Sequence, residues 1–269
     1  MKILAVLAAF WSFAEAAAQT ASSPRQITGS QVVAVSVDNY NRVVTADTKG
    51  NITAYDTLGN AQASYSPQMV ADVTLLEAWR SMKVLVFYRD LQQYVLLDRF
   101  LTPLAGYPYP ARLPAERIGF ARVLTLAFDD QLWVFDDTDF SLKKYNPQLQ
   151  AVTIHSPMGL VLDAKDYHIN FMREYQSQVF VNDRNSGIMV FDNLGNYRKK
   201  LPLPNAEYFQ FADDELYFAD GDALHFYNIY TAAERKVKLP FAARFAVVSG
   251  RKIFAFGADG GFVWNIANE

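Results

Sequence analysis

The hexapeptide YDTLGN at residues 55–60 returns almost unchanged as FDNLGN at residues 191–196. The first ends the segment SVDNYNRVVTADTKGNITAYDTLGN (36–60), and the second ends SQVFVNDRNSGIMVFDNLGN (177–196). Each segment holds an alternating apolar run ending in Asp, a polar turn, and a second alternating run ending in an aromatic residue and Asp. Alternation is typical of half-buried strands, and Asp, Gly and Asn favour turns. Each copy therefore predicts two antiparallel strands joined by short turns.

The same register continues along the whole chain. An apolar or aromatic residue followed by Asp or Asn recurs every 36 to 48 residues, with the polar member at Asp56, Asp98, Asn146, Asp192, Asn228 and Asn265. A proline follows each of the first five at a distance of 11 or 12 residues, and another strand-like run, such as QVVAVSVD (31–38), precedes each pair. Units of four strands with a repeat of about 40 residues predict a β-propeller.

The two ends of the chain predict how the ring closes. The sixth unit lacks its outer strand, because the sequence stops at Glu269 before the expected proline. A spare strand-sized stretch, Arg25–Thr28, precedes the first inner strand. Pairing it with the sixth unit would remove an exposed sheet edge. We therefore expect an all-β, six-bladed propeller whose last blade is closed by the N-terminal strand.

Two segments carry a resemblance to a known family. DNYNRVVTADTKGNITAYDTLG (38–59) and QVFVNDRNSGIMVFDNLG (178–195) resemble NHL repeats, within the TolB-like superfamily of six-bladed propellers. That superfamily includes lactonases with carboxylate-bound calcium and lyases with histidine-bound zinc. This chain shows no clear match to either ligand set, so the resemblance implies the fold and transfers no catalytic residue, metal or cofactor.

The N-terminus has the pattern of an export signal. Lys2 is followed by an apolar run over residues 3–13 and by Ala16-Ala17-Ala18. We expect residues 1–18 to be a signal peptide cut between Ala18 and Gln19, which leaves residues 19–269 as one propeller domain. A run of about 11 apolar residues is too short to cross a bilayer. The expected location is the periplasm or the outside of the cell.

The composition and net charge of the chain exclude several classes of partner and chemistry. The formal net charge of −3 provides no basic surface for nucleic acid. The absence of cysteine removes disulfides and thiolate chemistry. No later stretch is apolar enough for a membrane span, so none is expected in the mature chain.

Residues that could carry chemistry do not converge in this register. His155 falls in an outer strand, His168 in an inner strand and His225 in a third strand, so we expect no histidine metal site. Acids recur at strand ends, namely Asp47, Asp137, Asp183 and Asp220. They could ring the channel as calcium ligands, but acceptors for the backbone of the following turn are favoured, because the position repeats in every copy.

Two long connections are the candidate binding elements. They are ARLPAERIGFA (Ala111–Ala121) and MGLVLDAKD (Met158–Asp166), predicted to rise on one face beside blades three and four. Binding and tolerated insertion are both open for them. The candidate partner-binding charges are Arg112, Glu116, Arg117, Asp163, Lys165 and Arg184. Trp79 and Arg80 join them, at the end of an inner strand close to the predicted channel mouth.

These observations favour an exported, non-catalytic propeller that binds or scaffolds another protein of the bacterial cell envelope, without a cofactor. A metal-dependent hydrolase or lyase with its site at the channel mouth is the alternative. A small-ligand sensor is a third class, which an apolar pocket in the channel would favour. Fold alone does not choose among them.

Overall fold

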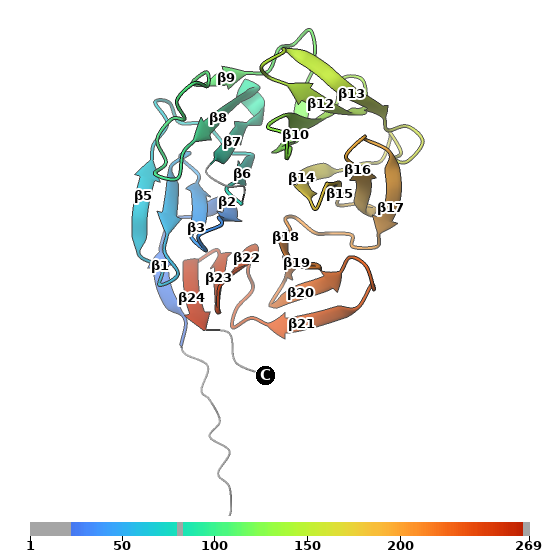
Figure 1. Cartoon of the computed structure of the whole chain (residues 1–269). Coiled ribbons are helices and arrows are strands. Elements are labelled where there is room, and N and C mark those ends of the chain that lie inside the picture. Colours follow the sequence, from blue (N-terminus) through green and yellow to red (C-terminus); the bar gives the residue numbers. More distant parts are fainter. Residues whose placement is uncertain (1–22, 80–82, 266–269) are drawn as a thin grey trace, which may run out of the picture.

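The computed structural model describes residues 23–79 and 83–265, which form six antiparallel sheets arranged in a ring around a central axis (Figure 1). Each sheet has four strands, as in the blade of a propeller. Within the described ranges the only helical element is one 3-10 turn, η1 (Arg89–Leu91), so no helix there could cross a bilayer. The expected all-β, six-bladed propeller is confirmed.

In each blade the strands are given from the channel outward. Blade 1 contains β2 (Val32–Val37), β3 (Val43–Asp47), β4 (Ile52–Tyr55) and β5 (Ala61–Tyr65). Blade 2 contains β6 (Leu75–Glu77), β7 (Val84–Tyr88), β8 (Gln93–Leu97) and β9 (Ala111–Arg112). Blade 3 contains β10 (Ala121–Leu126), β11 (Leu132–Asp136), β12 (Ser141–Asn146) and β13 (Ala151–Pro157).

The second half of the ring follows the same order. Blade 4 contains β14 (Ile169–Tyr175), β15 (Gln178–Asp183), β16 (Gly187–Asp192) and β17 (Tyr197–Leu201). Blade 5 contains β18 (Gln210–Ala212), β19 (Glu215–Asp220), β20 (Ala223–Asn228) and β21 (Glu234–Lys238). Blade 6 contains β22 (Phe245–Ser249), β23 (Lys252–Gly257), β24 (Gly260–Asn265) and, at the rim, β1 (Arg25–Thr28).

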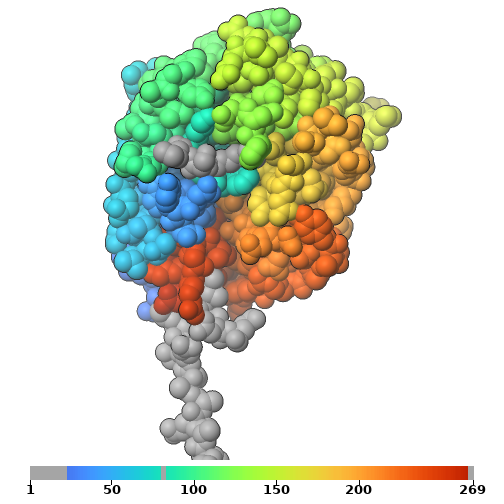
Figure 2. Space-filling model, in the orientation of Figure 1, coloured from blue at the N-terminus to red at the C-terminus, as the bar shows by residue number. Residues whose placement is uncertain are grey.

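The first strand of the chain closes the ring, as the sequence predicts. β1 pairs antiparallel with β24, and Arg25 lies opposite Val263 while Thr28 lies opposite Gly261. In the space-filling view the blue N-terminal and red C-terminal segments accordingly lie side by side (Figure 2). This pairing covers the edge of β24, which would otherwise offer unpaired backbone groups to another chain.

The repeated acid closes the turn after its strand. Asp56 Oδ1 accepts hydrogen bonds from the backbone N–H groups of Leu58 and Asn60 at 2.9 and 2.8 Å. Asp192 makes the equivalent pair in the second copy, at 2.9 Å each. Asp98 bonds its turn in the same way. The turn-acceptor role expected of the strand-end acids is confirmed at Asp47, which accepts from Lys49 N and Asn51 N, and at Asp183, which accepts from Asn185 N at 3.3 Å.

The glycine of the repeated hexapeptide lies where two blades meet. Gly59 and Gly195 both have a φ of +80°, which a residue with a Cβ adopts only at a cost. A Cβ on Gly59 would also lie 2.4 Å from Ile27 Cγ2 in β1, and one on Gly195 would lie 2.4 Å from Ser156 Oγ in β13. In both copies the turn therefore packs on the outer strand of the preceding blade, which explains why YDTLGN and FDNLGN agree so closely.

Two expected strand positions are corrected. The outer strand of blade 2, β9, has only two residues and follows Pro110, whereas outer strands were expected to end near their proline. Arg112 consequently lies in this strand and not in a loop. His168 lies just before β14 and not within the inner strand.

Candidate functional site

The meander of each blade sorts its connections onto two faces. Turns between second and third strands, and connections from one blade to the next, lie on what we call the loop face; the other hairpins lie on the opposite, hairpin face, because each strand reverses direction. Backbone hydrogen bonds tie the two kinds of loop-face connection together. Leu113 N donates to Gln92 O, and Met158 N donates to Phe140 O, both at 3.0 Å.

Both long connections lie on the loop face and flank blade 3. Residues 113–120 lead into β10, and residues 158–168 lead from β13 to β14. Between them lies the turn that joins β11 to β12, residues 137–140. Each connection is fixed to this turn or to its first neighbour, Asp136, by the contacts described next.

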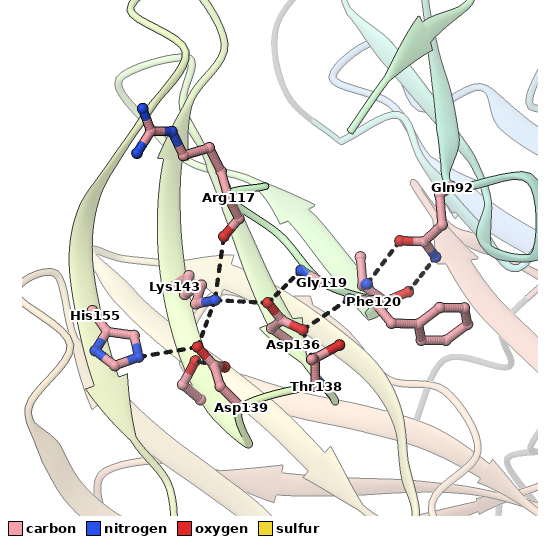
Figure 3. Close-up of polar contacts among 11 residues, drawn as sticks. Gln92, Arg117, Gly119, Phe120, Asp136, Thr138, Asp139, Lys143 and His155 are labelled. Atoms are coloured by element: carbon pink, nitrogen blue, oxygen red, sulfur yellow. Dashed lines mark hydrogen bonds and ion pairs between the residues drawn. The ribbon is translucent and has the colours of Figure 1, made fainter. Parts of the chain in front are cut away.

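Asp136 holds the first connection through a buried network (Figure 3). Its side chain is fully buried and accepts hydrogen bonds from the backbone N–H groups of Gly119 and Phe120, both at 2.9 Å. Thr138 N donates to it at 3.0 Å, and Lys143 Nζ lies 2.7 Å from Asp136 Oδ2. One carboxylate thus closes its own turn and anchors the end of residues 113–120.

Lys143 extends this network to the surface. Its ammonium group lies 2.7 Å from Asp139 Oδ2 and donates to the carbonyl oxygen of Arg117 at 3.3 Å. His155 Nε2 lies 3.4 Å from the same carboxylate (Figure 3). Burial disfavours the charged form of Asp136, but the hydrogen bonds from Lys143 and the backbone outweigh it and hold the pKa of Asp136 below its ordinary value.

The second connection is fixed by the neighbouring acid. Tyr167 OH donates to Asp137 Oδ1 at 3.1 Å, and Arg122 Nη2 lies 2.6 Å from Asp137 Oδ2. The Arg122 guanidinium also lies over the Tyr167 ring, 5.3 Å from its centroid. Asp137 was expected to be the turn acceptor of this blade; that prediction is wrong, because β11 ends one residue earlier and Asp136 takes the role.

The structure places five of the predicted charges on these connections or beside them. Arg112 in β9, Glu116 and Arg117 on residues 113–120, and Asp163 and Lys165 on residues 158–168 are all exposed. Neither Arg112 nor Arg117 makes an ion pair within residues 23–79 and 83–265.

The exposed surface of the two connections also has apolar side chains. Leu160 is 100% exposed and Phe120 is 37% exposed, on residues 158–168 and 113–120 respectively. Sequence reasoning named the charges of the loops and missed these two residues. Their signal was available, since each is a large apolar residue in a segment without strand alternation.

Arg184, the sixth charge, lies at the loop-face mouth of the channel. Its Nη1 is 3.4 Å from Glu207 Oε1, and Arg244 Nε is 3.1 Å from Glu207 Oε2. These three side chains line a cavity of about 200 Å³ together with Phe171 and Tyr208. Two guanidinium groups thus share one carboxylate here, a grouping that sequence reasoning did not find.

Trp79 lies on the opposite, hairpin face, at the other mouth of the channel. Its Nε1 donates to Glu77 Oε1 at 2.9 Å, and its ring centroid is 5.8 Å from that of Tyr175. It lines two adjoining cavities of about 430 and 500 Å³. Arg80, predicted beside it, lies outside the described residues. The predicted candidates therefore do not form one surface, because Trp79 is separated from the six charges by the depth of the ring.

The histidines are distributed over three blades. His155 is in β13, His225 is in β20 and pairs with Glu234 at 3.0 Å, and His168 lies at the loop-face mouth. Among the residues that the structure describes, no three His, Asp or Glu side chains gather into a group suited to a metal ion.

Comparisons with known proteins identify the fold only. No family model and no curated protein sequence matches the chain. Among solved structures, BamB from Moraxella catarrhalis is 14% identical with a TM-score of 0.50, over 87% of this chain and 85% of that one. YCF48 bound to D1 peptide is 11% identical with a TM-score of 0.58, over 91% and 96%. Virginiamycin B lyase from Staphylococcus aureus is 11% identical with a TM-score of 0.60, over 88% and 95%. The chain is thus a β-propeller, and the propellers it is similar to include one seen with a bound peptide and one named as a lyase.

Proposed function

We propose that this protein is an exported, NHL-like propeller that binds another protein of the bacterial cell envelope through the loop face of blade 3. The observation that carries the proposal is the platform formed by residues 113–120 and 158–168. Both connections are fixed to the turn of blade 3 through Asp136, Asp137 and Phe140. A rigid scaffold that holds long exposed loops is the usual setting for binding residues.

The chemistry of the platform suits a protein partner with acidic groups around an apolar contact. Arg117 on the platform and Arg112 beside it in β9 are exposed, and arginine is enriched in protein interfaces. Leu160 and Phe120 add exposed apolar surface to the platform. Arginine forks bind carboxylates bidentately, so exposed Asp or Glu on the partner would pair with them. YCF48, one of the similar propellers, is seen with a bound peptide, which supports a peptide or protein ligand by analogy of fold.

The export part of the proposal rests on the N-terminal sequence pattern. Residues 1–18 lie outside the described residues, and so does the expected cut between Ala18 and Gln19. Mass spectrometry of the protein from the periplasm of an expressing bacterium should show Gln19 as its first residue. An intact Met1 in the cytoplasmic fraction would contradict export.

Cross-linking of the purified protein in envelope extract tests the binding surface. We expect one partner whose cross-links map to residues 113–120 and 158–168, and whose recovery falls at least tenfold for the double variant R112E/R117E. Arg99→Glu is the matched control, because Arg99 is exposed on the hairpin face and its change should leave recovery unaltered. Equal loss for both variants, or cross-links confined to the hairpin face, would contradict the proposal.

A further inference from the structure

A buried arginine on the innermost strand of blade 4 has unused hydrogen-bonding capacity. Arg173 on β14 is only 1% exposed. Its Nη1 donates to Gln210 Oε1, and the Gln210 amide in turn donates to Tyr208 OH. Among the residues that the structure describes, its buried Nε and Nη2 have no hydrogen-bond partner. Buried polar atoms are nearly always paired, so two orphan donors on one charged group require an explanation.

No carboxylate neutralises this guanidinium within residues 23–79 and 83–265. Two acids, Asp38 and Asp213, line the same cavity, and no ion pair joins either of them to Arg173. Asp38 Oδ2 pairs with Arg42 Nε at 2.7 Å. Glu77 accepts hydrogen bonds from Trp79 and, at 2.6 Å, from the Thr125 hydroxyl. A buried charge is costly unless it is paired, and arginine does not lose its proton to escape that cost.

The two orphan donors lie on the same edge of the guanidinium. In the planar guanidinium, the Nε–H bond and one Nη2–H bond point the same way, while Nη1 projects to the other side. That edge matches the two oxygens of a carboxylate, which it binds through two parallel hydrogen bonds. Because Gln210 occupies Nη1, the edge left without a partner is the one suited to a carboxylate.

The cavity that Arg173 lines has aromatic walls. Arg173 and Gln210 line the hairpin-face cavity of about 430 Å³, together with Trp79, Tyr175 and Phe211. The Tyr175 and Phe211 rings stack with centroids 4.1 Å apart and an interplanar angle of 3°. A volume of this order holds a small organic molecule.

Two aromatic side chains that line the loop-face cavity contact Arg173. Phe171 and Tyr208 line the loop-face cavity, and their ring centroids lie 4.8 Å apart. The Arg173 guanidinium lies 5.2 and 5.7 Å from these two centroids, on the side of the hairpin-face cavity. Arg173 thus lines the hairpin-face cavity and not the loop-face cavity.

We propose that the hairpin-face mouth of the channel binds a small organic carboxylate with an aromatic body. Arg173 pairs with the carboxylate through Nε and Nη2, Gln210 fixes the guanidinium, and the rings of Trp79, Tyr175 and Phe211 hold the body of the ligand. This site is distinct from the loop-face platform and does not depend on a protein partner there.

Calorimetry and thermal shift with defined probes test the site. Benzoate and indole-3-acetate supply a carboxylate on an aromatic body, benzamide and indole-3-acetamide are their neutral counterparts, and inorganic phosphate is a tetrahedral anion. At 10 mM and constant ionic strength we expect each carboxylate to raise the Tm and to bind with 1:1 stoichiometry, while the amides and phosphate do not. Equal effects of acid and amide, a stronger effect of phosphate, or no effect of either carboxylate would overturn the proposal.

Two variants assign the effect to Arg173. R173M should abolish the carboxylate-dependent rise in Tm, and its own Tm should not fall, because an unpaired buried charge is removed. Arg244→Met at the other mouth should keep the full response; loss there with retention in R173M would overturn the assignment. If R173M does not fold, Gln210→Glu replaces it. An internal carboxylate would neutralise the guanidinium and weaken benzoate binding at least tenfold, and unchanged affinity would count against the site.

Discussion

Asp136 Oδ2 and Lys143 Nζ lie 2.7 Å apart, with the aspartate side chain fully buried and the lysine 8% exposed. The pair couples strand pairing in blade 3 to the connection that enters it, because the same carboxylate bonds Gly119 N and Phe120 N. The platform on the loop face therefore depends on one buried ion pair below it. This relationship makes the position of residues 113–120 testable through the stability of blade 3.

Removing the carboxylate should destabilise the whole domain. We expect Asp136→Ala to lower the free energy of unfolding by about 3–5 kcal/mol, because Lys143 and three backbone N–H groups lose a buried acceptor. Urea unfolding followed by tryptophan fluorescence measures it. Asp139→Asn, whose carboxylate is 43% exposed, should cost less than about 1 kcal/mol. Similar losses for both variants would show that the network does not centre on Asp136.

The same carboxylate should give an acid-dependent contribution. Because its pKa is lower in the folded protein, Asp136 stabilises the fold fully above the unfolded pKa of about 3.9 and loses this contribution as the pH falls through the folded value. The difference in unfolding free energy between wild type and Asp136→Asn should stay constant from about pH 7 to pH 5 and narrow below about pH 4. Urea unfolding at each pH gives the comparison, and a gap that widens in acid would reverse the sign argued above.

A methyl group at the seam of the ring should be costly. Gly59→Ala requires a φ of +80° and places a Cβ 2.4 Å from Ile27 Cγ2 of β1. Gly250→Ala is the matched control, because Gly250 also has a positive φ, +59°, but has open space around it. We expect the control to cost about 1–2 kcal/mol for the backbone alone, and Gly59→Ala to cost about 1–3 kcal/mol more for overpacking. Equal Tm values for the two variants would show that β1 moves to accommodate the added methyl group without a cost in stability.

The repeated aspartate should stabilise the fold through the backbone hydrogen bonds that it accepts from its turn. Asp192→Ala removes the acceptor for Leu194 N and Asn196 N, and its loss should cost about 1 kcal/mol, the scale of a net intramolecular hydrogen bond. Asp214→Ala provides the comparison, because Asp214 is an exposed acid in another hairpin and should stay within about 0.5 kcal/mol of wild type. Chemical denaturation distinguishes the two outcomes, and an indifferent Asp192 would remove the energetic basis of the motif.

The features that could be predicted from the sequence are those with local causes. The turn that follows Asp56 depends on residues within four positions, so YDTLGN and FDNLGN were sufficient to locate two blades. Closure by Arg25–Thr28 followed from counting strands, because the sixth unit lacked a fourth strand that this stretch could supply. The choice between Asp136 and Asp137 was not local: it depends on where β11 ends, and adjacent acids look alike in a sequence.

The candidate sites could not be located in full from the sequence, because their residues come together only in the folded structure. The charges of residues 113–120 and 158–168 could be assigned to one face, since connections of one kind emerge together. Arg173 could not be found, because INFMREY predicts an inner strand without indicating that its arginine is enclosed by side chains from blades 4 and 5. The contacts of Arg173 with Gln210 and Tyr208 join positions that belong to separate repeats.

The pairing of Arg25 with Val263 makes the two ends of the polypeptide members of one sheet. In an open solenoid, shortening either end removes a terminal repeat and leaves the others almost unchanged. In this protein, removal of β1 or of β24 disrupts the same sheet, blade 6, and opens the ring. We therefore expect the six sheets to unfold as one cooperative unit, because the closed ring requires every blade.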